Sequence, residues 1–129
     1  EFLEVIDDQV ADKNKVEKIL FCAGKVYYDL TAHRKENGNE NIAIIRIEQI
    51  YPLPKRQIES VIQTYKNVKK YTWLQEEPAN AGALAYMLQH FKIVPLEFIS
   101  RPASATPATG FYKQHKKELD KILEQAFGG

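Results

Sequence analysis

Two cations beside a proline-rich turn are the residues whose types and spacing come closest to a binding site. Gln49 precedes the turn at 51–54, and Lys55 and Arg56 follow it directly. Two cations near the N-terminus of a helix would bind a phosphate group better than either element alone, because the free amides of the first turn add donors. The pattern leaves two interpretations open here, a phosphate site and a solvated basic patch.

A second set of candidate site residues consists of two carboxylates and an arginine, which follow two further apolar runs. Glu76 and Glu77 follow one run, at the edge where open α/β sheets bind ligands. They would equally well offset the positive end of a following helix. The loop after Arg101 carries three hydroxyl side chains: Ser104, Thr106 and Thr109. These hydroxyls would either line a pocket or cap the last helix.

The local motifs of dinucleotide, P-loop, zinc-protease and dithiol redox chemistry are absent from the sequence. Cys22 lies inside an apolar run, where desolvation raises the pKa of a thiol, so we expect a core residue. The histidines have no metal-ligand spacing, and we expect packing or surface roles for them: His33, His90 and His115. The single glycine after the first run, Gly24, favours a tight turn over an anion-binding loop. We therefore predict no catalytic residue, no bound cofactor and no metal site in this chain.

The composition describes a globular chain with no global charge to attract a polyanion. Its 129 residues fit one domain, 44% of them are hydrophobic, and the net charge is +1. We therefore expect neither nucleic acid nor membrane as a partner. A single cysteine is typical of a reducing compartment, and we expect a cytoplasmic protein.

Apolar, β-rich runs alternate with segments of helical period along the chain. The runs lie at 19–23, 42–47, 71–75 and 96–99, and the helical segments at 25–37, 54–65, 81–91 and 111–127. This alternation predicts an α/β fold with a mostly parallel sheet. Gly38 is placed to end the first helix, and Asn80 to cap the third. Residues 2–6 are expected to add an edge strand, and 101–110 to form a loop.

Four strings, taken together and in order, resemble the C-terminal domain of the 2-oxoglutarate dehydrogenase E1 component. They are GKVYYDL at 24–30, IRIEQIYPLP at 45–54, QEEPANAGA at 75–83 and RPASATPA at 101–108. The resemblance covers about residues 18–127. It implies a three-layer α/β/α fold of the transketolase C-terminal type, with a mostly parallel five-stranded sheet and one antiparallel strand.

The same resemblance implies a non-catalytic assembly and regulatory role. In such enzymes 2-oxoglutarate is decarboxylated on thiamine diphosphate with Mg²⁺, and the succinyl group passes to lipoamide of the E2 component in the tricarboxylic acid cycle. The cofactor and the catalytic residues belong to earlier domains. We therefore expect residues 1–129 to be one domain of a longer E1 chain, with 1–17 as an extension or edge strand and 18–127 as its core. Its partners would be the upstream E1 domains and the second subunit of a homodimer, and its surface should carry exposed apolar patches.

Some members of this family carry an allosteric acetyl-CoA site on this domain, and the resemblance places its ligands at the proline-rich turn. The matching positions are Gln49 and Arg56, with Lys55 beside them. The next position is Gln57, where the family pattern has arginine. Losing one charge-assisted contact to a phosphate costs about 1.5 to 3 kcal/mol, which weakens the expected site.

Two alternatives come from other classes of function. The first is a stand-alone module that binds CoA or a nucleotide such as AMP through Gln49, Lys55 and Arg56. The second is a small hydrolase or reductase with a site among Glu76, Glu77 and Arg101. No nucleophile beside a base supports the second alternative.

Overall fold

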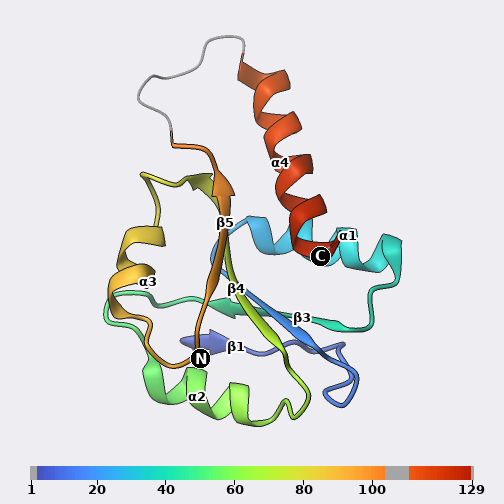
Figure 1. Cartoon of the computed structure of the whole chain (residues 1–129), viewed down its shortest axis with the longest axis vertical. Helices are drawn as coiled ribbons and strands as arrows, with labels where there is room; N and C mark the ends of the chain where they lie inside the picture. Colours follow the sequence, from blue (N-terminus) through green and yellow to red (C-terminus); the bar gives the residue numbers. More distant parts are fainter. Residues whose placement is uncertain (1–2, 104–110, 129) are drawn as a thin grey trace.

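The computed structural model describes residues 3–103 and 111–128, with side chains in the last helix described from Lys116 onward. The strands, shown as arrows in Figure 1, are β1 (Val5–Ile6), β2 (Lys18–Cys22), β3 (Ile42–Ile47), β4 (Lys70–Pro78) and β5 (Glu97–Arg101). The helices are α1 (Val26–Asn37), α2 (Lys55–Gln63), α3 (Leu84–His90) and α4 (Phe111–Gly128). None of these helices, within the described ranges, is long and apolar enough to cross a membrane.

The strands form one sheet in the order β1-β3-β2-β4-β5. β1 is antiparallel to β3, with Val5 opposite Ile47, and all other neighbours are parallel. Four strands therefore end at the same edge of the sheet. The topology confirms the expected mostly parallel sheet with one antiparallel strand.

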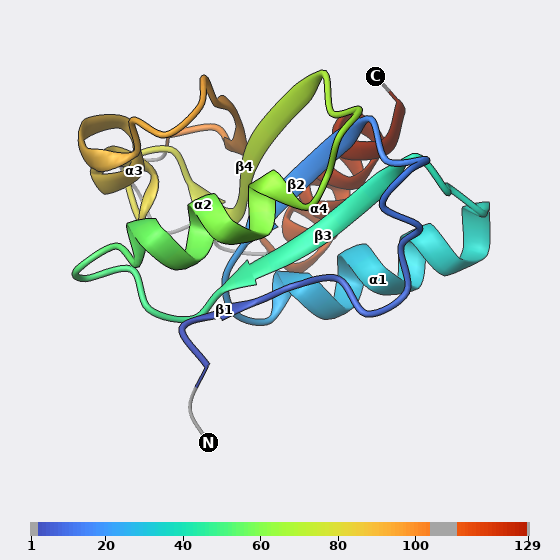
Figure 2. The same cartoon turned by 90° about the horizontal axis from the view of Figure 1, so that it is seen from below.

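Side-chain alternation in the central strand separates two cores. Ile19 and Phe21 of β2 point into a cluster that includes Ile58 of α2 and Met87 of α3. The intervening residue Leu20 lies in a second cluster, covered by α1 and α4. Because successive side chains of a strand point to opposite faces, a run that is apolar throughout must be covered on both. Figure 2 shows α2 and α3 on one side of the sheet and α1 and α4 on the other.

Glycines mark both ends of α1, as the sequence predicts. Gly24 and Gly38 have φ angles of 73° and 64°, a region that costs residues with a Cβ atom about 1 to 2 kcal/mol. The Gly38 amide donates to the carbonyl of Arg34 at 2.8 Å and closes the helix. The predicted helix at 25–37 is confirmed to within one residue.

The prediction for the third helix was wrong at its start. α3 begins at Leu84 rather than Ala81, and its N-cap residue is Ala83, not Asn80. β4 runs on to Pro78 instead of ending at Gln75. The intervening residues form a turn in which the Ala81 amide donates to the Pro78 carbonyl at 2.9 Å. The propensity of the alanines for helix is thus overridden by tertiary contacts.

A buried ion pair fastens the segment before β2. The side chains of Asp8 and Arg34 are 3% and 12% exposed, and the guanidinium donates to both carboxylate oxygens. Asp8 also accepts a hydrogen bond from the Ile44 amide at 2.8 Å, and bonds from Val10 and Ala11 at the same length. One carboxylate therefore connects the N-terminal segment, α1 and β3.

A buried lysine holds the end of α4 against the sheet. Lys18, at the start of β2, is 8% exposed and donates from Nζ to the carbonyl of Ala126 at 2.5 Å. Burial lowers the pKa of Lys18, and Lys70 lowers it further while Glu97 opposes the change. The carbonyls at a helix C-terminus favour a cation, so this contact offsets part of the desolvation.

Candidate functional site

The proline-rich turn places Lys55 and Arg56 at the first two positions of α2, with both side chains exposed. The first turn of the helix carries no acidic residue and no side-chain cap. Gln49 lies at the other end of the turn, where its Nε2 donates to the Pro52 carbonyl at 3.1 Å. The structure therefore brings two cations to the N-terminus of a helix, although the Lys55 amide already donates to the Leu53 carbonyl at 2.9 Å, and Gln49 holds the turn. Ligand binding by these three residues stays a prediction.

Gln57, which departs from the family pattern, has a different partner. Its Nε2 donates to Oε2 of Glu4 at 3.0 Å. This position therefore carries no cation, and its side chain holds a carboxylate of the N-terminal segment close to the turn. That carboxylate reduces the positive potential that an anionic effector would meet.

Gln75 organises the turn between β4 and α3. It is 3% exposed, accepts from Trp73 Nε1 at 3.0 Å, and donates to the carbonyls of Pro78 and Ala81 at 3.0 and 2.8 Å. A Cβ atom on Gly82 would lie 3.1 Å from Gln75 Nε2. The QEEPANAGA string therefore encodes a turn wrapped around one buried amide.

Arg101 is built into the same edge of the sheet. Its Nε donates to the backbone carbonyl of Glu76 at 2.6 Å, and its Nη1 lies 3.3 Å from Oε1 of Glu118 on α4. The Ala79 amide donates a hydrogen bond to the backbone carbonyl of Arg101 at 2.9 Å. These contacts give Arg101 a structural role. The hydroxyl residues expected to join it, Ser104, Thr106 and Thr109, lie outside the described residues.

The two carboxylates of the second set do not form an acid–base pair with a nucleophile. Glu77 is exposed, whereas Glu76 is half-buried and lies near Asp29 of α1. Burial, and then the Glu76 carboxylate, raise the pKa of Asp29. Among the described residues, this pair therefore forms no catalytic site, because repulsion between carboxylates without a reacting group performs no chemistry.

Arg46 lies at the carboxyl end of β3, between aromatic and acidic partners. Its guanidinium carbon is 4.5 Å from the ring centre of Tyr27, and Nη2 donates to Glu48 at 2.8 Å. Neighbouring Cys22 is fully buried, and desolvation raises the pKa of its thiol to about 12. A protonated, inaccessible thiol is not a nucleophile, which confirms its expected core role.

The histidines with described side chains are packing residues, as expected. His33 stacks on Phe127 with ring centres 4.7 Å apart, and His90 stacks on Tyr86 at 4.2 Å. The side chain of His115 lies outside the described residues. Within the described part of the chain, no three metal-ligating side chains of His, Cys, Asp or Glu lie together.

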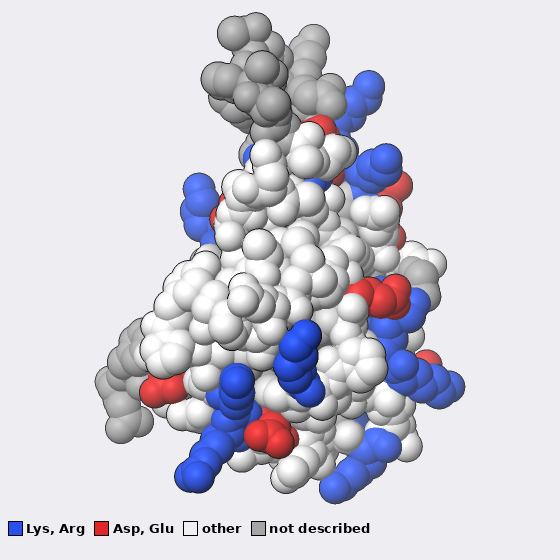
Figure 3. Space-filling model, turned by 60° about the vertical axis from the view of Figure 1, so that its left-hand side comes forward, with Lys and Arg blue, Asp and Glu red and all other residues white. Residues whose placement is uncertain are grey.

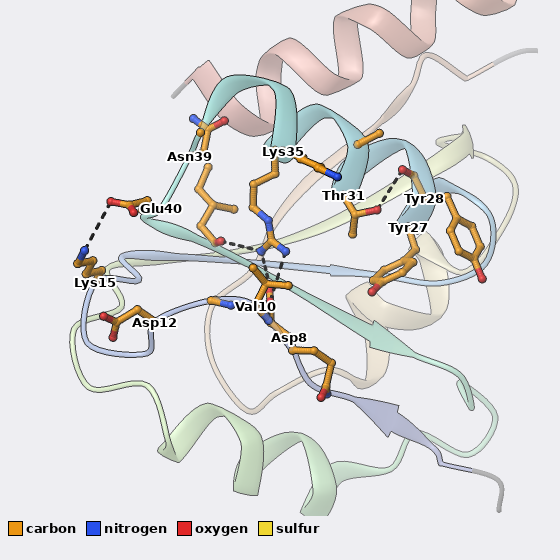
Figure 4. A pocket seen from close by; sticks show the side chains of 16 residues that line it. Asp8, Val10, Asp12, Lys15, Tyr27, Tyr28, Thr31, Lys35, Asn39 and Glu40 are labelled. Carbon is orange, nitrogen blue, oxygen red and sulfur yellow. Dashed lines mark hydrogen bonds and ion pairs between the residues drawn. The ribbon is translucent and has the colours of Figure 1, made fainter.

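A hollow of about 770 Å³ that the sequence did not predict lies between α1 and segment 8–12. Figure 4 shows Tyr28 on the α1 wall and Val10 on the wall formed by the N-terminal segment, and the residues of the buried Asp8–Arg34 pair also line the hollow. Asn39 Oδ1 is buried at its rim without a hydrogen-bond partner among the described residues. The two walls are far apart in sequence, so no local spacing of residues could reveal the hollow.

The layers and strand order define the transketolase C-terminal type of α/β/α domain. The structure is similar to a solved protein titled "Split gene transketolase, inactive beta4 tetramer", with a TM-score of 0.57 and 10% sequence identity. The match covers 89% of this chain and 40% of the other. At that identity the likeness shows the fold alone.

The chain belongs to the family described as 2-oxoglutarate dehydrogenase C-terminal, whose model matches residues 1–127. It is 44% identical to "Oxoglutarate dehydrogenase" of Buchnera aphidicola over 97% of its length. It is 42% identical to the "2-oxoglutarate dehydrogenase E1 component" of Azotobacter vinelandii over 90%, and 40% identical to that of Rickettsia felis over 98%. The chain spans 14%, 13% and 14% of these relatives respectively.

Proposed function

We propose that this chain is the non-catalytic assembly and regulatory domain of a 2-oxoglutarate dehydrogenase E1 component. The observation that carries the proposal is the family match over residues 1–127, at up to 44% identity to proteins named for that enzyme. The full enzyme would decarboxylate 2-oxoglutarate and pass the succinyl group to lipoamide of E2. The domain would support that reaction by packing against upstream E1 domains and the second subunit of a homodimer.

Thiamine diphosphate and Mg²⁺ would be held by the part of the enzyme outside this chain. Thiamine diphosphate supplies the electron sink for decarboxylation when it is bound. The described residues do not fit this group, because they bring together no cluster of three metal-ligating side chains. We therefore derive no catalytic step from this chain.

Decarboxylation assays with a soluble electron acceptor test this proposal. A full-length polypeptide that includes this chain should oxidise 2-oxoglutarate when supplied with thiamine diphosphate and Mg²⁺, whereas residues 1–129 alone should not. Turnover by residues 1–129 would contradict the non-catalytic role. A full-length polypeptide that uses pyruvate but not 2-oxoglutarate would contradict the substrate.

A second candidate function is binding of a phosphorylated effector at the start of α2. It is favoured by the exposed Lys55 and Arg56 at a helix N-terminus without an acidic residue in its first turn. Acetyl-CoA and AMP are the two ligands to be compared. This site would serve either regulation of the enzyme or, in the alternative reading, a stand-alone CoA- or nucleotide-binding module.

Calorimetric titration with acetyl-CoA and AMP tests this effector site. The double change Lys55→Gln and Arg56→Gln should abolish the heat, because two charge-assisted phosphate contacts contribute about 3 kcal/mol or more together. Lys66→Gln, at an exposed lysine beyond the far end of α2, is the matched control and should change nothing. Absence of heat from the unmodified chain at millimolar ligand would refute the effector site.

We also propose a cytoplasmic location. The observation behind it is that the cysteine is free and buried, as is usual for proteins in a reducing compartment. Fractionation of the source cells, with the chain detected by antibody, would test this location.

A further inference from the structure

An apolar surface that no other described residue covers surrounds α3. We call it the α3 face, and its members are Tyr51, Tyr86, Leu88, Ile93, Val94 and Leu96. Tyr51 is 64% exposed and Leu88 is 53% exposed, which is unusual for side chains of their size. The other four are partly buried against the core beneath α2 and α3. They are therefore rigidly supported from below while their outer surfaces meet solvent.

Aromatic contacts hold this surface in one shape. The rings of Tyr51 and Tyr86 meet edge to face, with centres 4.4 Å apart. The ring of His90 stacks on that of Tyr86, with centres 4.2 Å apart. These contacts join the proline-rich turn to α3. Beside them lies a hollow of about 380 Å³, lined by Leu88 and Val94 among others. A fixed apolar surface with a hollow is suited to receiving the side chains of another protein surface.

Charged groups are sparse on this side of the molecule. Figure 3, in which the α3 side comes forward, shows a broad area without charged side chains above a few lysines, arginines and acids. Lys92 is exposed next to the hollow, but its Nζ donates to the Leu88 carbonyl at 3.3 Å at the end of the helix. By contrast, the hollow beside α1 is lined by Asp12, Lys15 and Lys35 among others. Depletion of charge is typical of the centre of a protein interface.

The N-terminal segment of this chain contacts the proline-rich turn, which carries one member of the α3 face, Tyr51. In the relatives, the matching region is 13% to 14% of the length, and the matching family model is described as C-terminal, so we infer that most of each relative precedes that region. Leu3 is 52% exposed, and the next carbonyl, of Glu4, accepts a bond from the Gln49 amide at 3.3 Å. Gln49 in turn holds the turn that carries Tyr51.

We infer that the α3 face is the surface through which this domain docks on the domains that precede it in the same E1 polypeptide. This inference rests on the proposed function and adds to it the contact surface and the occupant. The occupant would present a largely apolar surface, with a side chain entering the hollow beside Leu88. The α1 side, with its charged hollow, would remain open to solvent.

Two tyrosines of nearly equal exposure provide a test within one molecule. Tyr51 is 64% exposed and lies on the α3 face, whereas Tyr28 is 62% exposed and lies on α1. In the full-length polypeptide, tetranitromethane should nitrate Tyr51 at least about tenfold more slowly than Tyr28, which corresponds to an undocked population of about a tenth or less. Equal nitration of the two tyrosines would overturn the inference. Protection of Tyr51 that is lost on dilution would overturn it in favour of a second copy of the chain.

A pair of substitutions provides the second measurement. Leu88→Glu in the full-length polypeptide would place a carboxylate in the apolar contact, and nitration of Tyr51 should rise about tenfold or more. Val10→Glu, at a residue 82% exposed beside α1, is the matched control and should leave the ratio unchanged. Unchanged nitration in Leu88→Glu would refute the docking surface. The 2-oxoglutarate assay on the unmodified polypeptide keeps this outcome separate from failure of the proposed function.

Discussion

The Asp8–Arg34 pair is the residue-scale contact on which the N-terminal segment depends. Burial alone would raise the pKa of Asp8, but the Arg34 guanidinium and the amides of Ile44, Val10 and Ala11 outweigh it and lower the pKa. The carboxylate is therefore more stable in the folded chain than in water. No local pattern of residues in the sequence indicates this pair, because its two members lie 26 positions apart.

Replacing Asp8 should have a large effect on stability. Asp8→Asn leaves the Arg34 charge, which is 12% exposed, without its counter-ion, and should lower the free energy of unfolding by about 3 kcal/mol. Glu40→Gln breaks an ion pair on the surface, in which the side chains of Glu40 and Lys15 are 76% and 57% exposed. It should lower the free energy of unfolding by less than about 1 kcal/mol. Urea unfolding at neutral pH measures both changes. Equal losses would contradict the importance of burial.

The lowered pKa of Asp8 also predicts a dependence on pH. A carboxylate whose pKa is lower in the folded state contributes its full stabilisation above the unfolded value of 3.8. That contribution is lost as the pH falls below 3.8 toward the lower pKa of the folded chain. The difference in urea midpoint between the parent and Asp8→Asn should therefore shrink between pH 5 and pH 3. A difference that is the same at both pH values would show that the charge is not responsible.

At the scale of elements, the turn from β4 to α3 depends on one glycine. Gly82 has a φ angle of 66°, and a Cβ atom would lie 3.1 Å from both Gln75 Nε2 and the Cβ of Glu77. Gly82→Ala should cost about 2 to 4 kcal/mol, from the backbone conformation and the close contacts together. Gly24→Ala, with φ of 73° and open space around the new atom, should cost only about 1 kcal/mol. Denaturant unfolding compares the two, and equal costs would exclude the contact with Gln75.

This turn also marks the limit of what the sequence could predict about elements. The positions of the strands and of the other helices follow from apolar runs, helical period and flanking glycines, which are local signals, but the extension of β4 to Pro78 does not. The start of α3 does not, because Ala81 is a good helix former by its own propensity. The backbone carbonyl of Ala81 instead accepts a hydrogen bond from the buried side-chain amide of Gln75. Only the tertiary position of that amide determines where the helix begins.

At the scale of the whole molecule, the sequence could predict a candidate site only where the residues of that site are adjacent in the chain. The cations Lys55 and Arg56 and the helix behind them are adjacent in sequence, so their meeting could be foreseen. The α3 face could not be outlined, although the family resemblance predicted apolar patches. Its parts come from the proline-rich turn, α3 and segment 91–98, and they meet only through the contact of Tyr51 with Tyr86 and the core beneath.

Docking through the α3 face should make the stability of this domain depend on the rest of the polypeptide. A partner that binds only the folded domain stabilises it by mass action, so the domain should unfold at a higher temperature in the full-length chain than alone. Each kcal/mol of docking free energy should raise that temperature by about 4 °C. Leu88→Glu changes an exposed position and should alter the stability of residues 1–129 by less than about 0.5 kcal/mol.

In the full-length chain, the same substitution should remove most of the additional stability, because the carboxylate opposes docking. Hydrogen exchange of amides in β2, measured alone and in the full-length chain with and without Leu88→Glu, provides the comparison. Val10→Glu serves again as the control and should be neutral in both forms. If Leu88→Glu had the same effect alone and in the full-length chain, its action would be on α3 itself and not on a contact between domains.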